Sequence, residues 1–377
     1  MARDSLAQDP ARPMYDNGNV TDAYAAAGVD TRQADAGVAA LVDVLSTIQT
    51  GRERLSIPLP GHYASVIRIA PGLGMALATD SVGSKVMVAE QARRFTTIGI
   101  DCVAMNVNDL ICVGAEPLAL LDYLAVEQAD PELLRDLAVG LKAGAEAAGV
   151  EIPGGEVCQI PEVIRGHPSP YGFDLVGSAF GTVALDAIVD GNACVPGDAV
   201  IGLPASGVHS NGLTLARRVL LDQAGLDLDA RPEALGGPSV ADVLLEPTVI
   251  YVRAILDLLR SDAAVHGLAH ITGGGLLNLL RLGRDVGFEI TDPLPVPRVF
   301  QAIAQLGGVG PAEMWEVFNM GCGFCVVVPE RDAAGTVALL EARHPGTAVI
   351  GRCTDRAGRV SVPRLGIEGE SGQMRSV

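Results

Sequence analysis

The segment 79–85, Thr-Asp-Ser-Val-Gly-Ser-Lys, holds the residue types best suited to chemistry, and it directly follows a strand-like apolar run. Its acid can bind a metal, and its glycine, hydroxyls and lysine can contact phosphate oxygens. The chain contains only two lysines, Lys85 and Lys142, against many arginines, so a lysine at this turn favours a site that needs a compact ammonium. The segment predicts a corner that binds phosphate and metal, although a solvated surface hairpin would carry the same residues.

A polar stripe on an apolar helix is the second candidate. The spacing from residue 97 to 113 predicts a helix, and a turn of about 100° per residue places Asp101 and Asn108 on one face, with Asp109 beside them. Buried carboxylates need a compensating charge, so these side chains indicate a site unless they face solvent. A further glycine and acid corner, Gly154-Gly155-Glu156, is predicted at the end of a short strand.

Two small polar loops in the second half each connect a predicted strand to the start of a predicted helix. The first is 206–212, Ser-Gly-Val-His-Ser-Asn-Gly, and the second is 272–275, Thr-Gly-Gly-Gly. Free N–H groups at such positions bind anions. Each loop has a histidine nearby, His209 and His270, which could transfer a proton or could merely hydrogen-bond the backbone.

The composition limits the class of protein. The chain has 377 residues, 49% of them hydrophobic, which is enough to build a large core in two domains. No apolar run approaches the roughly 20 residues that span a bilayer, and no secretory leader is visible, so we expect a cytoplasmic protein. The net charge of -18 argues against nucleic acid or an anionic membrane as a partner. The seven cysteines are expected to be reduced, buried thiols.

The elements that must position these residues repeat along the chain. Strands are predicted at 65–69 and 74–79, and an amphipathic helix at 36–48 is expected to dock on the body. The strand and helix pattern starts again after the turn at 196–197, which places a domain boundary near residue 190 and predicts domains 1–190 and 191–377. A second strongly periodic helix is predicted at 246–260.

Taken in order, the motifs resemble those of one enzyme family, phosphoribosylformylglycinamidine cyclo-ligase, also called AIR synthetase. The resemblance covers about residues 20 to 355 and rests on segments 79–85, 98–110, 114–118, 121–123, 154–156, 206–212, 266–275 and 318–321. It implies a two-domain α/β (α+β) fold whose N-terminal domains join in a dimeric β-barrel, with a C-terminal α/β domain. It also implies ATP-dependent ring closure of formylglycinamidine ribonucleotide to aminoimidazole ribonucleotide, with Mg²⁺ as cofactor and a homodimer as the assembly.

The resemblance and the local patterns together assign roles to individual residues. Catalytic roles are predicted for His209, His270 and Lys85, and a metal site for Asp80, Asp109 and Glu156. Nucleotide contacts are predicted for Asp80, Gly83, Ser84, Lys85, Asp101, Asn108, Asp109, Gly154, Gly155 and Glu156. Substrate contacts are predicted for Ser206, Gly207, Ser210, Asn211, Thr272, Gly273, Gly274 and Gly275.

Some segments depart from the family pattern. The glycine and phenylalanine loop before the first strand is replaced by residues 60–65, Pro-Gly-His-Tyr-Ala-Ser. The usual Gly-Gly-Glu-Thr-Ala-Glu is Gly-Gly-Glu-Val-Cys-Gln at 154–159, and Val157 and Gln159 suggest a different role. A non-catalytic nucleotide-binding paralogue that acts as a regulatory subunit therefore remains the alternative. ADP release that depends on formylglycinamidine ribonucleotide distinguishes the enzyme from this paralogue.

Overall fold

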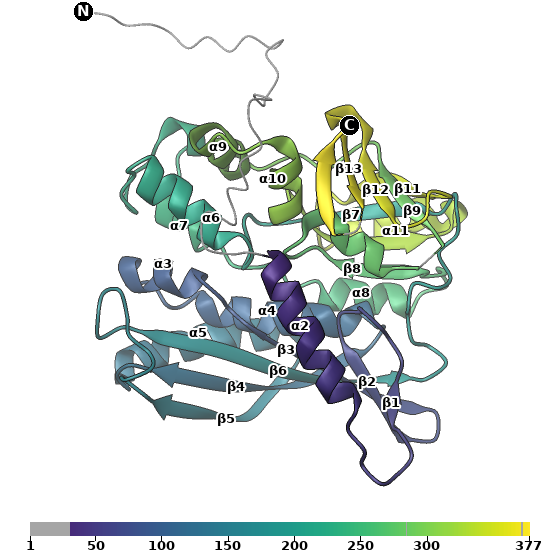
Figure 1. Ribbon diagram of the computed structural model, residues 1–377, viewed down its shortest axis with the longest axis horizontal. Coiled ribbons are helices and arrows are strands. Elements are labelled where there is room, and N and C mark those ends of the chain that lie inside the picture. Colours follow the sequence, from purple (N-terminus) through teal and green to yellow (C-terminus); the bar gives the residue numbers. More distant parts are fainter. Residues whose placement is uncertain (1–30, 284, 371) are drawn as a thin grey trace, which may run out of the picture.

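The computed structural model describes residues 31–283, 285–370 and 372–377, and it consists of two α/β halves, one above the other in Figure 1. The first half ends with strand β6 at Ala184, and the second half begins with β7 at Ala199. No described helix has both the length and the apolar character needed to cross a membrane.

A six-stranded sheet forms the first half, with strand order β1-β2-β3-β6-β4-β5. Helices α4 and α5 cover one face of this sheet, called the inner face below. The elements of this half are α2 (Thr31–Ser46), β1 (Ser56–Ile57), β2 (Ser65–Ala70), β3 (Leu73–Ser81), α3 (Lys85–Ala92), α4 (Ile98–Cys112), β4 (Glu116–Val126), α5 (Pro131–Ala148), β5 (Glu151–Gln159) and β6 (Phe173–Ala184).

An eight-stranded sheet forms the second half, with strand order β14-β13-β12-β9-β11-β7-β10-β8. Its strands are β7 (Ala199–Pro204), β8 (Gly267–His270), β9 (Gly287–Ile290), β10 (Cys322–Val328), β11 (Ala348–Thr354), β12 (Arg359–Val362), β13 (Ile367–Glu370) and β14 (Gln373–Ser376). Its helices are α6 (Leu213–Arg217), η1 (Arg218–Gln223), η2 (Glu233–Leu235), α7 (Val240–Leu244), α8 (Val252–Leu259), η3 (Gly275–Arg281), α9 (Arg298–Gly307), α10 (Pro311–Val317), α11 (Glu330–Glu341) and η4 (Pro363–Leu365).

Local sequence explains why the helices of the first half start and pack where they do. Asp130 caps α5 by accepting hydrogen bonds from two backbone N–H groups, and Pro131 occupies the first turn, where its missing N–H costs nothing. Helix α4 approaches α5 so closely that a Cβ atom on Gly99 would lie 2.0 Å from the backbone nitrogen of Leu141. Glycine at this position therefore lets α4 pack directly against α5 on this face of the sheet.

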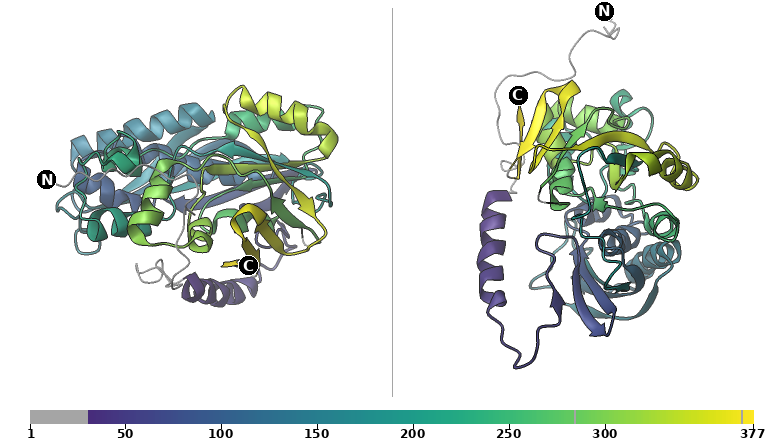
Figure 2. Two further views of the ribbon diagram at one scale, coloured as in Figure 1. Left: turned by 90° about the horizontal axis from the view of Figure 1, so that it is seen from above. Right: turned by 90° about the vertical axis from the view of Figure 1, so that its right-hand side faces the viewer.

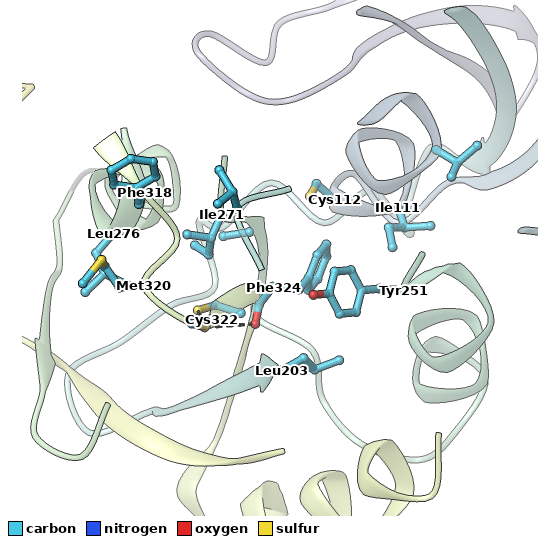
Figure 3. Packing of buried hydrophobic residues seen from close by; sticks show 14 of the residues in the cluster. Ile111, Cys112, Leu203, Tyr251, Ile271, Leu276, Phe318, Met320, Cys322 and Phe324 are labelled. Carbon is cyan, nitrogen blue, oxygen red and sulfur yellow. Dashed lines mark hydrogen bonds between the residues drawn. The ribbon is translucent and has the colours of Figure 1, made fainter. Parts of the chain in front are cut away.

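The hydrophobic core continues from one half into the other. In Figure 3, Ile111 and Cys112 of α4 lie beside the rings of Tyr251 and Phe324, which belong to the second half. The two ring centroids are 5.3 Å apart. Because both halves bury apolar side chains in this seam, α4 has a fixed position relative to the second half.

Three predicted elements differ from the structure. The predicted helix 246–260 is helical only at α8, and residues 246–251 form an irregular segment because their backbone bonds to polar groups of α4. Gly154-Gly155-Glu156 lies inside β5, not at the end of a strand. Helix α2 does not dock on the body: it stands apart on the side of the sheet away from α5 (Figures 1 and 2), with its apolar side chains exposed.

The two strands predicted at 65–69 and 74–79 are β2 and β3, and both lie inside the sheet. Strand β2 lies between β1 and β3, and β3 lies between β2 and β6, so neither has a free edge in the sheet. The open surface of this sheet is the face opposite α4, which we call the outer face. Large apolar side chains on β4 point to it, with Leu118 50%, Leu121 40% and Tyr123 41% exposed.

Candidate functional site

Two carboxylates and a histidine meet at the junction of the two halves. Asp80 is near the end of β3, Asp109 is on α4, and His270 ends β8 of the second half. The imidazole Nδ1 of His270 lies 2.9 Å from Asp109 Oδ1, and the carboxylates are close enough that Asp109 raises the pKa of Asp80. The structure thus brings together two of the three predicted metal-binding acids.

The surroundings of Asp80 disfavour the ionised form of its carboxyl group. Burial, and then the neighbouring charge of Asp109, raise its pKa from 3.8 to about 6, against the lowering effect of the Ser81 backbone N–H. A divalent cation bound between two neighbouring carboxylates favours the ionised form of both. Mg²⁺ in nucleotide sites is held by one or two carboxylates together with phosphate oxygens, so this pair fits that ion.

Asp80→Asn should therefore stabilise the protein at alkaline pH. The folded-state pKa lies above the unfolded value, so ionisation of Asp80 opposes folding, and this cost appears as the pH rises from about 4 to above 6. We expect the variant to gain roughly 1–2 kcal/mol in free energy of unfolding at pH 8 and almost nothing at pH 4. Urea unfolding at the two pH values measures the difference. Asp262→Asn, at an exposed turn, is the control, and an equal gain for both variants would exclude this origin.

The His270 ring contacts Asp109 and does not face solvent. Its ring is fully buried, Nδ1 faces the Asp109 carboxylate, and Nε2 lies 3.4 Å from the amide nitrogen of Asn108. A carboxylate can only accept, so Nδ1 carries the proton and donates it. His270, predicted to be catalytic, holds the orientation of Asp109 in this arrangement.

Lys85 and Asp101 form a fully buried ion pair. The ammonium Nζ lies 2.8 Å from Asp101 Oδ2 and donates a hydrogen bond to the Glu246 carbonyl. Asp101 also accepts hydrogen bonds from the N–H and the hydroxyl of Thr248 and from the hydroxyl of Ser210. The compensating charge demanded by Asp101 is thus Lys85. Neither side chain is exposed for a nucleotide, contrary to the prediction for both.

Asn108 completes the polar face of α4. Its amide nitrogen donates to the Val249 carbonyl, and its amide oxygen accepts from the Tyr251 N–H. Asp101 and Asn108 do share one face, as predicted, but that face binds the backbone of residues 246–251. The predicted nucleotide contacts of this pair are replaced by contacts between the two halves.

The His209 side chain is buried against its own loop, 206–212. It is 2% exposed, its Nε2 accepts a hydrogen bond from the Ser206 N–H, and its backbone has a positive φ of 60°. Burial lowers the pKa of His209 well below 6.5, so the ring is neutral at physiological pH. A neutral ring tied to its own loop shapes that loop, and the structure does not place the ring at the surface.

The two predicted substrate loops do meet. A Cβ atom on Gly273 would lie 3.2 Å from Asn211 Oδ1. The Ser206 hydroxyl donates to the Pro247 carbonyl, and Ser84 Oγ lies 3.0 Å from Thr214 Oγ1 across the junction. Ser206 and Gly207 also line a cavity of about 230 Å³ together with Glu246 and Arg298. The loops therefore border the same junction as the acids, and Gly83, with a φ of 70°, turns the chain there.

Glu156 does not join the acids. In the strand register, Asp80 lies opposite Gly177, Gly177 opposite Asp122, and Asp122 opposite Gly155, so three strand spacings, about 14 Å, separate β3 from β5. Glu156 pairs with Tyr123, whose side chain points to the outer face. Within the described residues, no group of three or more histidine, cysteine or acidic side chains is placed to hold a metal.

Three residues that hold the loops are not among the predicted site residues. Thr248 and Tyr251 were assigned to a helix, and Asn278 was not singled out. Asn278 is a lone polar residue in the apolar run 276–280, and buried polar groups need partners, so this interruption was the available signal.

Both halves match models of one family. The model described as "AIR synthase related protein, N-terminal domain" matches residues 61–183, and "AIR synthase related protein, C-terminal domain" matches residues 195–362. A phosphoribosylformylglycinamidine cyclo-ligase from Methanothermobacter thermautotrophicus is 46% identical over 90% of this chain and 96% of its own length. The protein of the same name from Thermococcus kodakarensis is 44% identical over 92% of this chain and 99% of its own length.

Solved structures share the fold at lower identity. Hydrogenase maturation protein HypE in complex with ATP has a TM-score of 0.56 and 22% identity, covering 85% of this chain and 89% of that one. AaThiL complexed with AMPPCP and TMP has a TM-score of 0.58 and 17% identity, covering 86% of this chain and 92% of that one. These two similarities show a common two-domain architecture.

Proposed function

The chain belongs to the family of AIR synthase related proteins, and from its curated relatives we propose that it is a phosphoribosylformylglycinamidine cyclo-ligase. In this reaction, ATP phosphorylates the formyl oxygen of formylglycinamidine ribonucleotide, and the amidine nitrogen then displaces phosphate and closes the imidazole ring. The products are aminoimidazole ribonucleotide, ADP and phosphate. This is a cytoplasmic step of purine biosynthesis.

The acid pair Asp80 and Asp109 is the observation that carries the proposed site. The two carboxylates would hold Mg²⁺, which would neutralise charge on the transferring phosphoryl group. His270 fixes Asp109 by donating from Nδ1. Loops 206–212 and 272–275 offer backbone N–H groups to the anionic substrate from the second half. Catalysis in this arrangement is mainly positioning and electrostatic stabilisation.

A turnover assay tests the function. Purified protein with ATP and Mg²⁺ should release ADP only when formylglycinamidine ribonucleotide is present. ADP release that does not depend on the ribonucleotide, or no release at all, would contradict the proposal. The regulatory paralogue gains no support, because Val157 and Gln159, which suggested it, lie on edge strand β5, three strands from Asp80.

We propose further that the chain is a homodimer joined through the outer face of the six-stranded sheet. This face exposes Leu118, Leu121 and Tyr123, and helix α2 stands on the same side with Leu41 59% and Leu45 50% exposed (Figure 2). Apolar surface of this extent is a hazard for a monomer and is typical of an interface. Packing of two such faces would produce the β-barrel implied by the family resemblance.

Charge on the outer face should separate the subunits. Leu121→Asp places a carboxylate in the middle of the proposed interface, where it would be desolvated without a partner. Sedimentation at low micromolar concentration should show a dimer for the unaltered protein and a monomer for the variant. Glu116→Gln, at the exposed start of β4, serves as the control. A stable, active monomer of the unaltered protein would contradict the dimer.

A further inference from the structure

The glycine turn 272–275 is wrapped around one buried amide group. Asn278 is 3% exposed, and its Nδ2 lies 3.0 Å from the Gly273 carbonyl oxygen and 2.9 Å from that of Gly275. The Thr272 carbonyl oxygen is 3.5 Å away, at the limit of a hydrogen bond. A single side chain therefore binds the Gly273 and Gly275 carbonyl groups from inside the turn, and the Thr272 carbonyl, which accepts from the Gly275 N–H, lies at the edge of its reach.

The peptide geometry then fixes the direction of the N–H groups. A peptide bond is planar and trans, so its C=O and N–H point in opposite directions. With the carbonyls of Thr272 and Gly273 turned toward Asn278, the N–H groups of Gly273 and Gly274 point away from it. In the part of the chain that the structure describes, neither N–H donates to a backbone carbonyl. Gly273 itself is exposed.

The far side of the turn is held as well. Gly275 has a positive φ of 53°, and a Cβ atom there would lie 2.0 Å from the Trp315 carbonyl oxygen, so no other residue fits. The turn is thus held between α10 and the side chain of Asn278. Its outward N–H groups have a defined position before any ligand binds.

Tyr63, a residue of the first half, contacts Asn278 as well. The Tyr63 hydroxyl donates to the backbone carbonyl of Asn278 at 3.1 Å, although the two residues are 215 positions apart in the chain. The Arg281 guanidinium lies 4.7 Å from the centre of the Tyr63 ring. Tyr63 belongs to the segment 60–65 that departs from the family pattern, so this contact gives the altered segment a role.

We propose that Asn278 is a positioning residue that turns the Gly273 and Gly274 N–H groups toward the phosphate-bearing substrate, with Tyr63 anchoring it from the first half. The proposal rests on the proposed function, since it assigns these N–H groups to the ribonucleotide and not to ATP. Asn278 touches no substrate atom. It acts only through the turn.

The variant Asn278→Asp tests the donor while preserving the shape. An ionised aspartate has the size of asparagine but can only accept, so it repels the carbonyls that asparagine binds. We expect the KM for formylglycinamidine ribonucleotide to rise about 10- to 100-fold, the effect of losing one or two hydrogen bonds, with the KM for ATP within about twofold of the unaltered protein. Gln223→Glu adds the same charge at an exposed position and should leave both constants unchanged.

Asn278→Ala and Tyr63→Phe keep the proposal testable if the aspartate variant does not fold. Alanine removes the donor without adding charge and should raise the same KM by less than aspartate does, and phenylalanine should raise it by a few-fold. Calorimetry with ribose 5-phosphate should show weaker binding in the same order. If the unaltered enzyme turns over and a folded Asn278 variant keeps its KM for the ribonucleotide within about twofold, the positioning role is wrong. If the unaltered enzyme does not turn over, the proposed function fails instead.

Discussion

Replacing Asp109 with asparagine is expected to lower the turnover number by at least about 10² to 10³-fold, the range found when one preorganised electrostatic group is removed from a site. Asparagine keeps an acceptor for the His270 Nδ1–H, so the orientation seen in the structure is preserved. What it removes is the negative charge that, with Asp80, would attract Mg²⁺. The apparent affinity for Mg²⁺ should fall along with kcat, while the fold should survive.

A second consequence of Asp109→Asn separates electrostatics from geometry. The charge of Asp109 helps to raise the pKa of Asp80, so in the variant that pKa should fall below its value of about 6. Carboxyl signals followed by NMR over pH 4–8 measure this shift. Asp262→Asn should change neither turnover nor the Asp80 titration. Normal Mg²⁺-dependent turnover in Asp109→Asn would remove Asp109 from the site.

The sequence identified the polar face of α4 but not its partner. A seven-residue spacing in a helix was sufficient to place Asp101 and Asn108 together, and the cost of burying a carboxylate required a countercharge. Which cation would supply it depends on tertiary contacts between segments far apart in the chain. Lys85 fills that role, and the segment 246–251 brings backbone groups that local periodicity assigned to a helix.

Strand order explains why Glu156 lies apart from the other two predicted metal-binding acids. Glu156 follows two glycines and resembles a strand-end corner, and nothing in its neighbourhood reveals that β4 and β6 intervene between it and Asp80. The face to which a strand residue points alternates with each position, so the side chain direction depends on pairing. For the same reason, the open outer face of the sheet was visible only after the strand order was known.

Replacing Lys85 with methionine is expected to destabilise the protein by about 3–5 kcal/mol, because it leaves the Asp101 carboxylate buried without its countercharge. Asp101 binds Ser210 and Thr248, so the loss should extend to loop 206–212 and lower activity with stability. The chain provides a matched control in its other lysine. Lys142 pairs with Glu146 at the surface, with 71% and 65% of the two side chains exposed, and Lys142→Met should cost no more than about 0.5 kcal/mol.

The double variant Lys85→Met with Asp101→Asn decides whether the ion pair itself causes the loss. With both charges removed, no uncompensated charge remains buried, while asparagine can still accept hydrogen bonds from Ser210 and Thr248. Urea unfolding should therefore find the double variant more stable than Lys85→Met alone. Such a gain shows an energetic coupling between Lys85 and Asp101, which independent sites do not have. If the two substitutions simply add, Lys85 contributes through packing and its hydrogen bond to the Glu246 carbonyl, and not through the charge of Asp101.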